Sequence, residues 1–159
     1  MLYVGMYLIA IVAANLIISY FGPAATIITA FVFIGLDITA RDKLHETWHG
    51  NGLLWKMFAL ILTGSIISYL LNQNTLQVGI ASAVAFSVAA TADALVYQKL
   101  FTKPWMLKVN ASNIVSAALD SIIFPTIAFG AFMPAIILGQ FLAKTFGGAI
   151  WAMIIEDRK

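Results

Sequence analysis

Six long apolar segments run along the chain, separated by shorter polar connections. A transmembrane helix needs about 20 predominantly apolar residues to cross the hydrocarbon core of a bilayer. The pattern therefore predicts an all-α membrane protein in which one domain, residues 1–159, contains six transmembrane helices. The expected spans are about 2–20, 24–38, 53–71, 75–98, 109–129 and 133–155. No Lys or Arg precedes the first segment, so we expect it to be a retained membrane helix and not a signal peptide.

The composition also indicates a membrane protein. Of the 159 residues, 62% are hydrophobic and only 10% are charged, whereas soluble globular domains carry about 25% charged residues. So few charged side chains cannot cover a water-facing surface, and we expect the lipid bilayer to contact most of the protein. Because the chain has no cysteine, disulfides and thiolate metal sites are excluded.

The positive residues predict the orientation. The connections after the first, third and fifth spans contain no Lys or Arg, whereas the other connections and the C-terminal tail contain most of them. These residues are Arg41, Lys43, Lys99, Lys103, Lys108, Arg158 and Lys159. The positive-inside rule makes their face cytoplasmic, so both termini of this multi-pass protein are expected in the cytoplasm, and the protein in the cytoplasmic (inner) membrane. The pI near 9.0 then reflects topology, and we expect no nucleic acid partner.

Four polar residues are expected at membrane depth. A charge near the bilayer centre costs at least about 2.5–3.5 kcal/mol, so it usually signals a function or a partner. Asp120 and Lys144 each lie about eleven residues from the cytoplasmic end of their spans, roughly 16 Å deep, and are expected to meet near the midplane. Asp93 lies about one turn inside the fourth span, and Asn15 lies in the second half of the first span.

Helical spacing places further polar residues beside this charged pair. Asn113, Ser116 and Asp120 follow i, i+3, i+7 and share one face of the fifth span, while Gln140 and Lys144 are i, i+4 on the sixth. The second stripe continues through Gly147, Gly148 and Trp151. Two interpretations are open. Asp120 and Lys144 either brace the bundle alone, or they belong to a pocket whose donors and acceptors bind a planar heteroaromatic ligand, with Trp151 able to stack on it.

The segment His45-Glu46-Thr47-Trp48-His49 matches H-E-x-x-H, the zinc motif of metalloproteases. A catalytic zinc takes three protein ligands, and the chain contains only these two histidines. The segment also lies in the charged connection after the second span, where Leu44 and Trp48 suggest the buried side of an amphipathic interfacial helix. We therefore expect no enzyme activity, no metal and no cofactor, with a membrane zinc protease as a remote alternative.

Several stretches together carry a family resemblance. They are residues 31–41 (FVFIGLDITAR, with D-x-T-x-R), 79–100 with Asp93, 113–130 (NIVSAALDSIIFPTIAFG, with N-x-x-S-x-x-x-D) and 139–144 (GQFLAK), together with Asn15. In the order and spacing of these stretches, the chain resembles the queuosine-precursor transporter family, also called the vitamin uptake transporter family. It departs from the family pattern in its short length and in Gln140, where some relatives carry an acid.

The resemblance implies a fold similar to the substrate-binding components of energy-coupling-factor importers. It also implies import of a 7-deazaguanine such as 7-cyano-7-deazaguanine, a purine-like precursor of queuosine. The pocket residues that it implies are Asn15, Asp93, Asn113, Asp120, Gln140 and Lys144, and Ser116 joins them on spacing. Asp37 and Arg41 become a cytoplasmic structural or gating pair.

The means of driving transport is left open by the sequence. No G-x-x-x-x-G-K-[ST] motif is present, so the chain is not expected to hydrolyse ATP itself. Transport is then facilitated, ion-coupled or powered by separate energising subunits, and a homo-oligomer is also open. The alternative within this class is a substrate-binding subunit for another vitamin that docks on an ATP-driven module.

Overall fold

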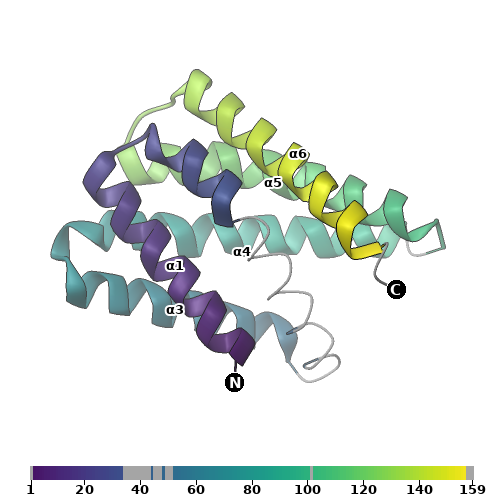
Figure 1. Ribbon diagram of the computed structural model, residues 1–159, viewed down its shortest axis with the longest axis horizontal. Coiled ribbons are helices and arrows are strands. Elements are labelled where there is room, and N and C mark those ends of the chain that lie inside the picture. The colour runs from purple at the N-terminus through teal and green to yellow at the C-terminus, as the bar shows by residue number, and fades with distance from the viewer. Residues whose placement is uncertain (1, 34–43, 45–47, 49–51, 101, 157–159) are drawn as a thin grey trace.

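The computed structural model describes residues 2–33, 44, 48, 52–100 and 102–156 of the chain (Figure 1). Its regular elements are α1 (Leu2–Phe21), a helical stretch over residues 25–33, α3 (Leu53–Leu71), the short 3-10 helix η1 (Gln73–Thr75), α4 (Leu76–Lys99), α5 (Trp105–Phe129) and α6 (Pro134–Glu156). The described residues contain no strand. Three helices are long and apolar enough to cross a membrane, over Leu2–Phe21, Gln73–Tyr97 and Trp105–Phe129. The chain is therefore an all-α membrane protein, as the hydropathy pattern predicts.

The observed helix bounds differ from the predicted spans mainly at α5. This helix begins at Trp105, four residues before the predicted start at 109, directly after Pro104. Proline fits at a helix start because its fixed φ suits the first turn and its missing N–H is not needed there. Lys108 then lies within the helix, with its Nζ 4.9 Å from the centre of the Tyr97 ring. The hydropathy boundary excluded this turn because it marks the hydrocarbon edge, whereas a helix can continue beyond it.

The other bounds shift by a residue or two, within the fraying expected at helix ends. The fourth span of 75–98 becomes Leu76–Lys99 preceded by η1, and the sixth span of 133–155 becomes Pro134–Glu156. Of the second predicted span, 24–38, residues 25–33 are helical, and the remainder lies outside the described residues together with Asp37 and Arg41.

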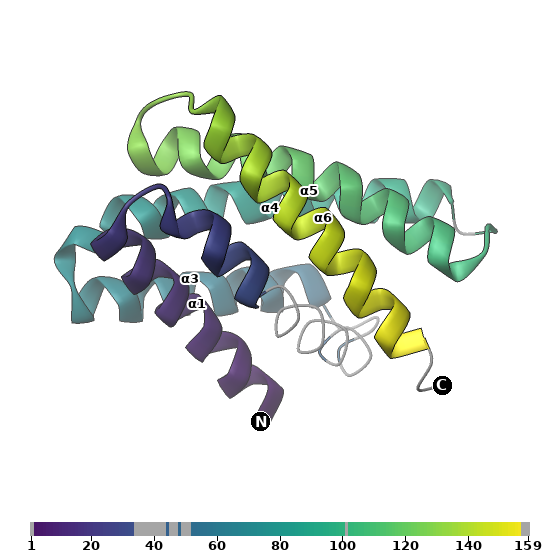
Figure 2. The same ribbon diagram turned by 45° about the horizontal axis from the view of Figure 1, so that its top comes forward.

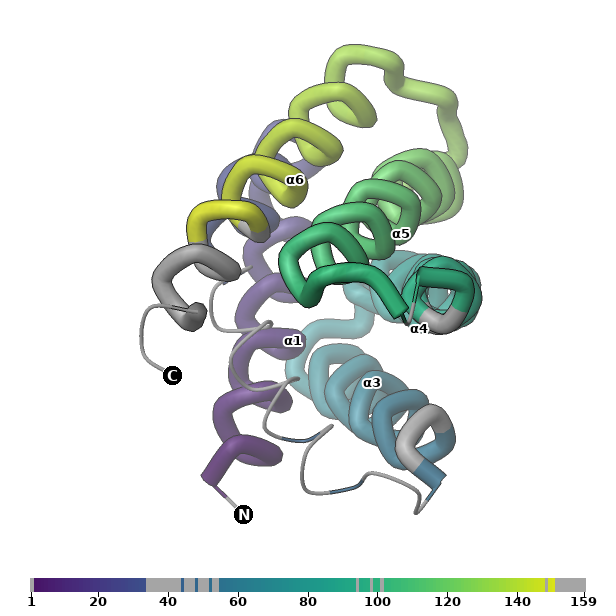
Figure 3. The backbone as a smooth tube through the Cα atoms, turned by 90° about the vertical axis from the view of Figure 1, so that its right-hand side faces the viewer, coloured from purple at the N-terminus to yellow at the C-terminus, as the bar shows by residue number. Residues whose placement is uncertain are grey.

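The helices follow one another around the molecule. Seen end-on in Figure 3, α6, α5, α4, α3 and α1 succeed each other, and each of these neighbouring pairs is in contact. Residues 25–33 lie between α1 and α6, as Figures 1 and 2 show. Small buried residues allow the α4 and α5 backbones to approach, since Ala81 and Ala85 of α4 pack in one cluster with Phe124 and Ala128 of α5.

Glycine permits close approach at two further helix contacts. A Cβ atom at Gly139 of α6 would lie 2.4 Å from Cδ1 of Ile27, and one at Gly64 of α3 would lie 2.7 Å from Cγ2 of Ile11 in α1. At Gly64 the Ile11 Cβ is also only 3.1 Å away, and a branched carbon so near the backbone cannot turn aside. Gly64 thus sets how closely α3 packs on α1.

We predict that Gly64→Ala lowers the free energy of unfolding in detergent by about 1–2 kcal/mol. Overpacking costs about 1–3 kcal/mol, and alanine recovers up to about 1 kcal/mol through its better helix propensity. Gly5→Ala in α1 is the matched control, because a Cβ there meets nothing within 4 Å. Thermal unfolding should show Gly64→Ala below the wild type and Gly5→Ala at or above it. Equal stability of the two variants would contradict this packing argument.

Candidate binding cavity

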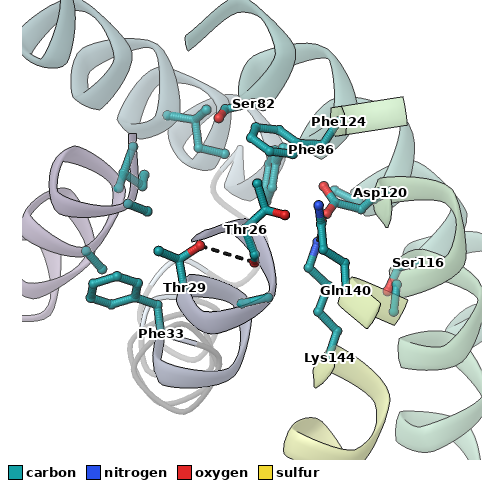
Figure 4. Close-up of a pocket in the computed structure, with 18 of the residues that line it drawn as sticks. Thr26, Thr29, Phe33, Ser82, Phe86, Ser116, Asp120, Phe124, Gln140 and Lys144 are labelled. Carbon is teal, nitrogen blue, oxygen red and sulfur yellow. Dashed lines mark hydrogen bonds and ion pairs between the residues drawn. The ribbon is translucent and has the colours of Figure 1, made fainter. Parts of the chain in front are cut away.

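A cavity of about 280 Å³ lies between the helices (Figure 4). It is lined from α1, residues 25–33, α3, α4, α5 and α6, so every described transmembrane element contributes to it. All seven residues that the sequence suggested for a pocket line it, namely Asn15, Asp93, Asn113, Ser116, Asp120, Gln140 and Lys144. The seven residues come from four helices, α1, α4, α5 and α6, and converge on one space.

Asp120 and Lys144 form an ion pair between α5 and α6. Their equal predicted depth led us to expect this contact, and the structure confirms it. Lys144 Nζ also donates to Oε1 of Gln140 at 3.3 Å, which joins the cation to the preceding turn of its own helix. The side chains remain 20% exposed for Lys144 and 26% for Asp120. The pair therefore faces the cavity and is not sealed between the two helices.

Two polar atoms at the cavity lack a hydrogen-bond partner among the described residues. Gln140 is 1% exposed, and its Nε2 donor is unpaired although its Oε1 accepts from Lys144. The Oδ1 acceptor of Asp93 is also buried and unpaired. A buried polar group without a partner costs about 1–3 kcal/mol, so such groups are rare unless something else satisfies them. One donor and one acceptor are thus available to a ligand.

Asn15 differs from these residues because its side chain is already bonded on both sides. Its Nδ2 donates to Oγ of Ser68 on α3 at 3.3 Å, and its Oδ1 accepts from Oγ of Ser82 on α4 at 3.1 Å. On α5, the Ser116 hydroxyl donates to the backbone carbonyl of Asn113 at 3.2 Å. Asn15 therefore joins three helices at the cavity wall, whereas Ser116 is satisfied within its own helix.

Three phenylalanines also line the cavity, which the sequence analysis missed. They are Phe33, Phe86 and Phe124, and Figure 4 shows them with Thr26, Thr29 and Ser82. The signal that could have found two of them is spacing, because Phe86 is four residues after Ser82 and Phe124 is four residues after Asp120. The predicted stacking residue, Trp151, has a side chain outside the description, so that prediction is untested.

Several predicted residues fall outside the described part of the chain. Asp37 and Arg41, the predicted gating pair, are among them, as are His45, Glu46 and His49 of the H-E-x-x-H segment. Within and beside that segment, Trp48 and Leu44 are described, and Leu44 is buried with Tyr7, Met57 and Ile61. Among the described residues, no group of three or more His, Asp or Glu side chains could hold a metal ion.

Apolar helices around a cavity with convergent polar groups are typical of membrane proteins that bind small molecules. A model of the family described as "Putative vitamin uptake transporter" matches residues 6–155. The chain belongs to this vitamin uptake transporter family, and is accordingly a membrane transport protein. No curated protein and no solved structure matches it. The similarity to substrate-binding components of energy-coupling-factor importers stays a prediction.

We predict that removing one partner of the Asp120–Lys144 pair destabilises the protein and that removing both does not. Asp120→Asn or Lys144→Met alone leaves an uncompensated charge at membrane depth, which should lower the free energy of unfolding by about 2–4 kcal/mol. The double variant Asp120→Asn/Lys144→Met should recover most of this loss. Thermal unfolding of the four proteins in detergent measures the coupling. Additive losses in the double variant would contradict an energetic link between the two side chains.

Proposed function

We propose that the chain imports a queuosine precursor, 7-cyano-7-deazaguanine or a related 7-deazaguanine, across the cytoplasmic membrane. The observation that carries this proposal is the pairing of an unsatisfied acceptor, Oδ1 of Asp93, with an unsatisfied donor, Nε2 of Gln140, on one cavity. A guanine-type ring presents N–H donors along one edge and a carbonyl acceptor, so it can satisfy both. The family supports transport of a small molecule, and the sequence resemblance supports this substrate class.

The remaining cavity residues support a flat and uncharged ligand. Phe33, Phe86 and Phe124 supply apolar faces on which a planar ring can stack. Lys144 is already balanced by Asp120, which favours a neutral ring over an anionic one. The cavity of about 280 Å³ is near the lower end of ligand sites, typically about 300–1,000 Å³, and suits a small bicyclic ring.

In the mechanism we propose, recognition and release depend on the same few contacts. The substrate N–H groups donate to the Asp93 carboxylate, and Gln140 donates to the ring carbonyl. Because Lys144 contacts Gln140, its ammonium group can donate to the same ring carbonyl. Asp120 keeps the Lys144 ammonium charge compensated while the cavity is empty or filled. These protein donors and acceptors replace the water molecules that hydrogen-bond the ring in solution. No polar group of the ring is then left without a hydrogen bond inside the bilayer.

A second candidate is a substrate-binding subunit for another vitamin, powered by a separate ATP-driven module. The family description, which names vitamins, favours it. The chain has no Walker-type loop of its own, so ATP would have to be hydrolysed by a partner. Purification from the native membrane separates the two proposals. Stoichiometric ATPase subunits that copurify with the chain would favour this second candidate.

We predict that the wild-type chain restores uptake of 7-cyano-7-deazaguanine in cells that cannot synthesise it. Asp93→Leu and Gln140→Met should each reduce that uptake at least about tenfold, because each removes a buried hydrogen-bonding group from the site. Thr63→Val is the matched control, since the Thr63 hydroxyl donates to Ala59 of its own helix at 2.8 Å and lies outside the cavity. Normal uptake by both cavity variants at equal membrane levels would refute the proposed pocket. Absence of uptake by the wild type would refute the substrate.

We predict that both termini lie in the cytoplasm, as the positive residues indicate. Because the natural chain has no cysteine, single cysteines can be labelled without background. Asn74→Cys, in the connection between α3 and α4, should react with a membrane-impermeant thiol reagent on intact cells. Lys103→Cys, between α4 and α5, should react only after the membrane is permeabilised. The reverse pattern would place the termini outside.

A further inference from the structure

A chain of three hydrogen bonds crosses α1, α3 and α4 at the cavity wall. The Ser68 hydroxyl donates to the Gly64 carbonyl of its own helix at 2.7 Å. Asn15 Nδ2 donates to Ser68 Oγ at 3.3 Å, and Ser82 Oγ donates to Asn15 Oδ1 at 3.1 Å. Ser68 is fully buried and is not among the residues that line the cavity, whereas Asn15 and Ser82 both line it.

The direction of this chain is set at its buried end. A backbone carbonyl can only accept, so the single hydrogen of the Ser68 hydroxyl is committed to Gly64. Toward Asn15, Ser68 can then act only as an acceptor, and the amide must turn its nitrogen to Ser68 and its oxygen to Ser82. Ser82 in turn gives its only hydrogen to that oxygen. The Ser82 oxygen therefore faces the cavity with lone pairs alone.

We propose that Ser82 is a specificity-determining residue that accepts a hydrogen bond from an N–H group of the transported ring. Ser68 is a positioning residue that fixes this polarity from outside the cavity. The inference rests on the proposed function, because it assigns a further contact to the same substrate. A free serine hydroxyl both donates and accepts, and so discriminates little between ring edges. A serine that can only accept favours an N–H and repels an unprotonated ring nitrogen.

The position of Ser82 suits this role. It is four residues before Phe86 on α4, so both side chains share one helix face, and both line the cavity together with Phe124 (Figure 4). A ring stacked against these phenylalanines would present part of its edge to the Ser82 oxygen.

The first experiment measures binding of 7-cyano-7-deazaguanine to the purified full chain by calorimetry. Three analogues are measured beside it, one without the exocyclic amine and two in which a ring N–H is replaced by N-methyl. Ser82→Ala should weaken binding of the parent compound about five- to tenfold. One of the analogues lacks the N–H group that Ser82 would accept from, and Ser82→Ala should not weaken binding of that analogue further. Ser82→Thr, which keeps the hydroxyl, should bind like the wild type.

The second experiment tests Ser68 through selectivity. Ser68→Ala removes the acceptor that fixes the orientation of the Asn15 amide. The Ser82 hydroxyl is then free to donate as well as to accept. The ratio of affinities for the parent compound and for the analogue that lacks the Ser82 partner should therefore fall about fivefold. Ser68→Thr should restore this preference. A merely structural role would lower the melting temperature and leave the affinity ratio unchanged. Ser87→Ala is the matched control, because Ser87 donates to Ala83 within α4 at 2.8 Å and lies off the cavity.

Three results would overturn the inference. Ser82→Ala could weaken all four ligands equally, or it could weaken none of them while the wild type binds the parent compound normally. In either case the proposed substrate stands and the role of Ser82 is wrong. If the wild type binds none of the four compounds, the proposed substrate fails, and the inference fails with it.

Discussion

Lipid offers no hydrogen bonds, so every polar side chain at membrane depth must be satisfied within the protein. Among the described residues, most serine and threonine hydroxyl groups meet the constraint locally. Thr63, Ser87, Thr91 and Thr126 each donate to a carbonyl four residues earlier on their own helix. Such residues say nothing about function. The polar groups that local bonding does not satisfy are more informative, and at the cavity they include the Asp120–Lys144 pair, the Asn15 chain and the unpaired atoms of Asp93 and Gln140.

These remaining polar groups face one space because small residues bring the helices together behind them. Ala81 and Ala85 allow α4 to pack against α5, and Gly64 and Gly139 allow close contacts of α3 with α1 and of α6 with Ile27. The bulkier aromatic residues Phe86 and Phe124 can then line the cavity. Phe124 belongs both to the cluster that joins α4 to α5 and to the cavity wall, so helix packing also positions a residue of the cavity.

Much of the fold and of the cavity follows from one-dimensional patterns. Hydropathy locates the helices because burial in lipid requires long apolar runs, and equal depth brings Asp120 to Lys144. Helical spacing groups Asn113 with Ser116, and Gln140 with Lys144. The cavity phenylalanines escape this reasoning, because an apolar side chain in a membrane helix fits lipid, core and ligand equally well. The Asn15–Ser68–Ser82 chain escapes it too, since such contacts depend on how three helices are rotated about their axes.

The unpaired atoms of Asp93 and Gln140 have a consequence for evolution and for engineering. Each lowers the stability of the empty protein, by about 1–3 kcal/mol for a buried group without a partner. An apolar residue of similar size at either position would make the helix bundle more stable, but it would remove a hydrogen-bonding group from the cavity. Selection for stability alone would therefore remove these two side chains, whereas the proposed role in ligand recognition would preserve them.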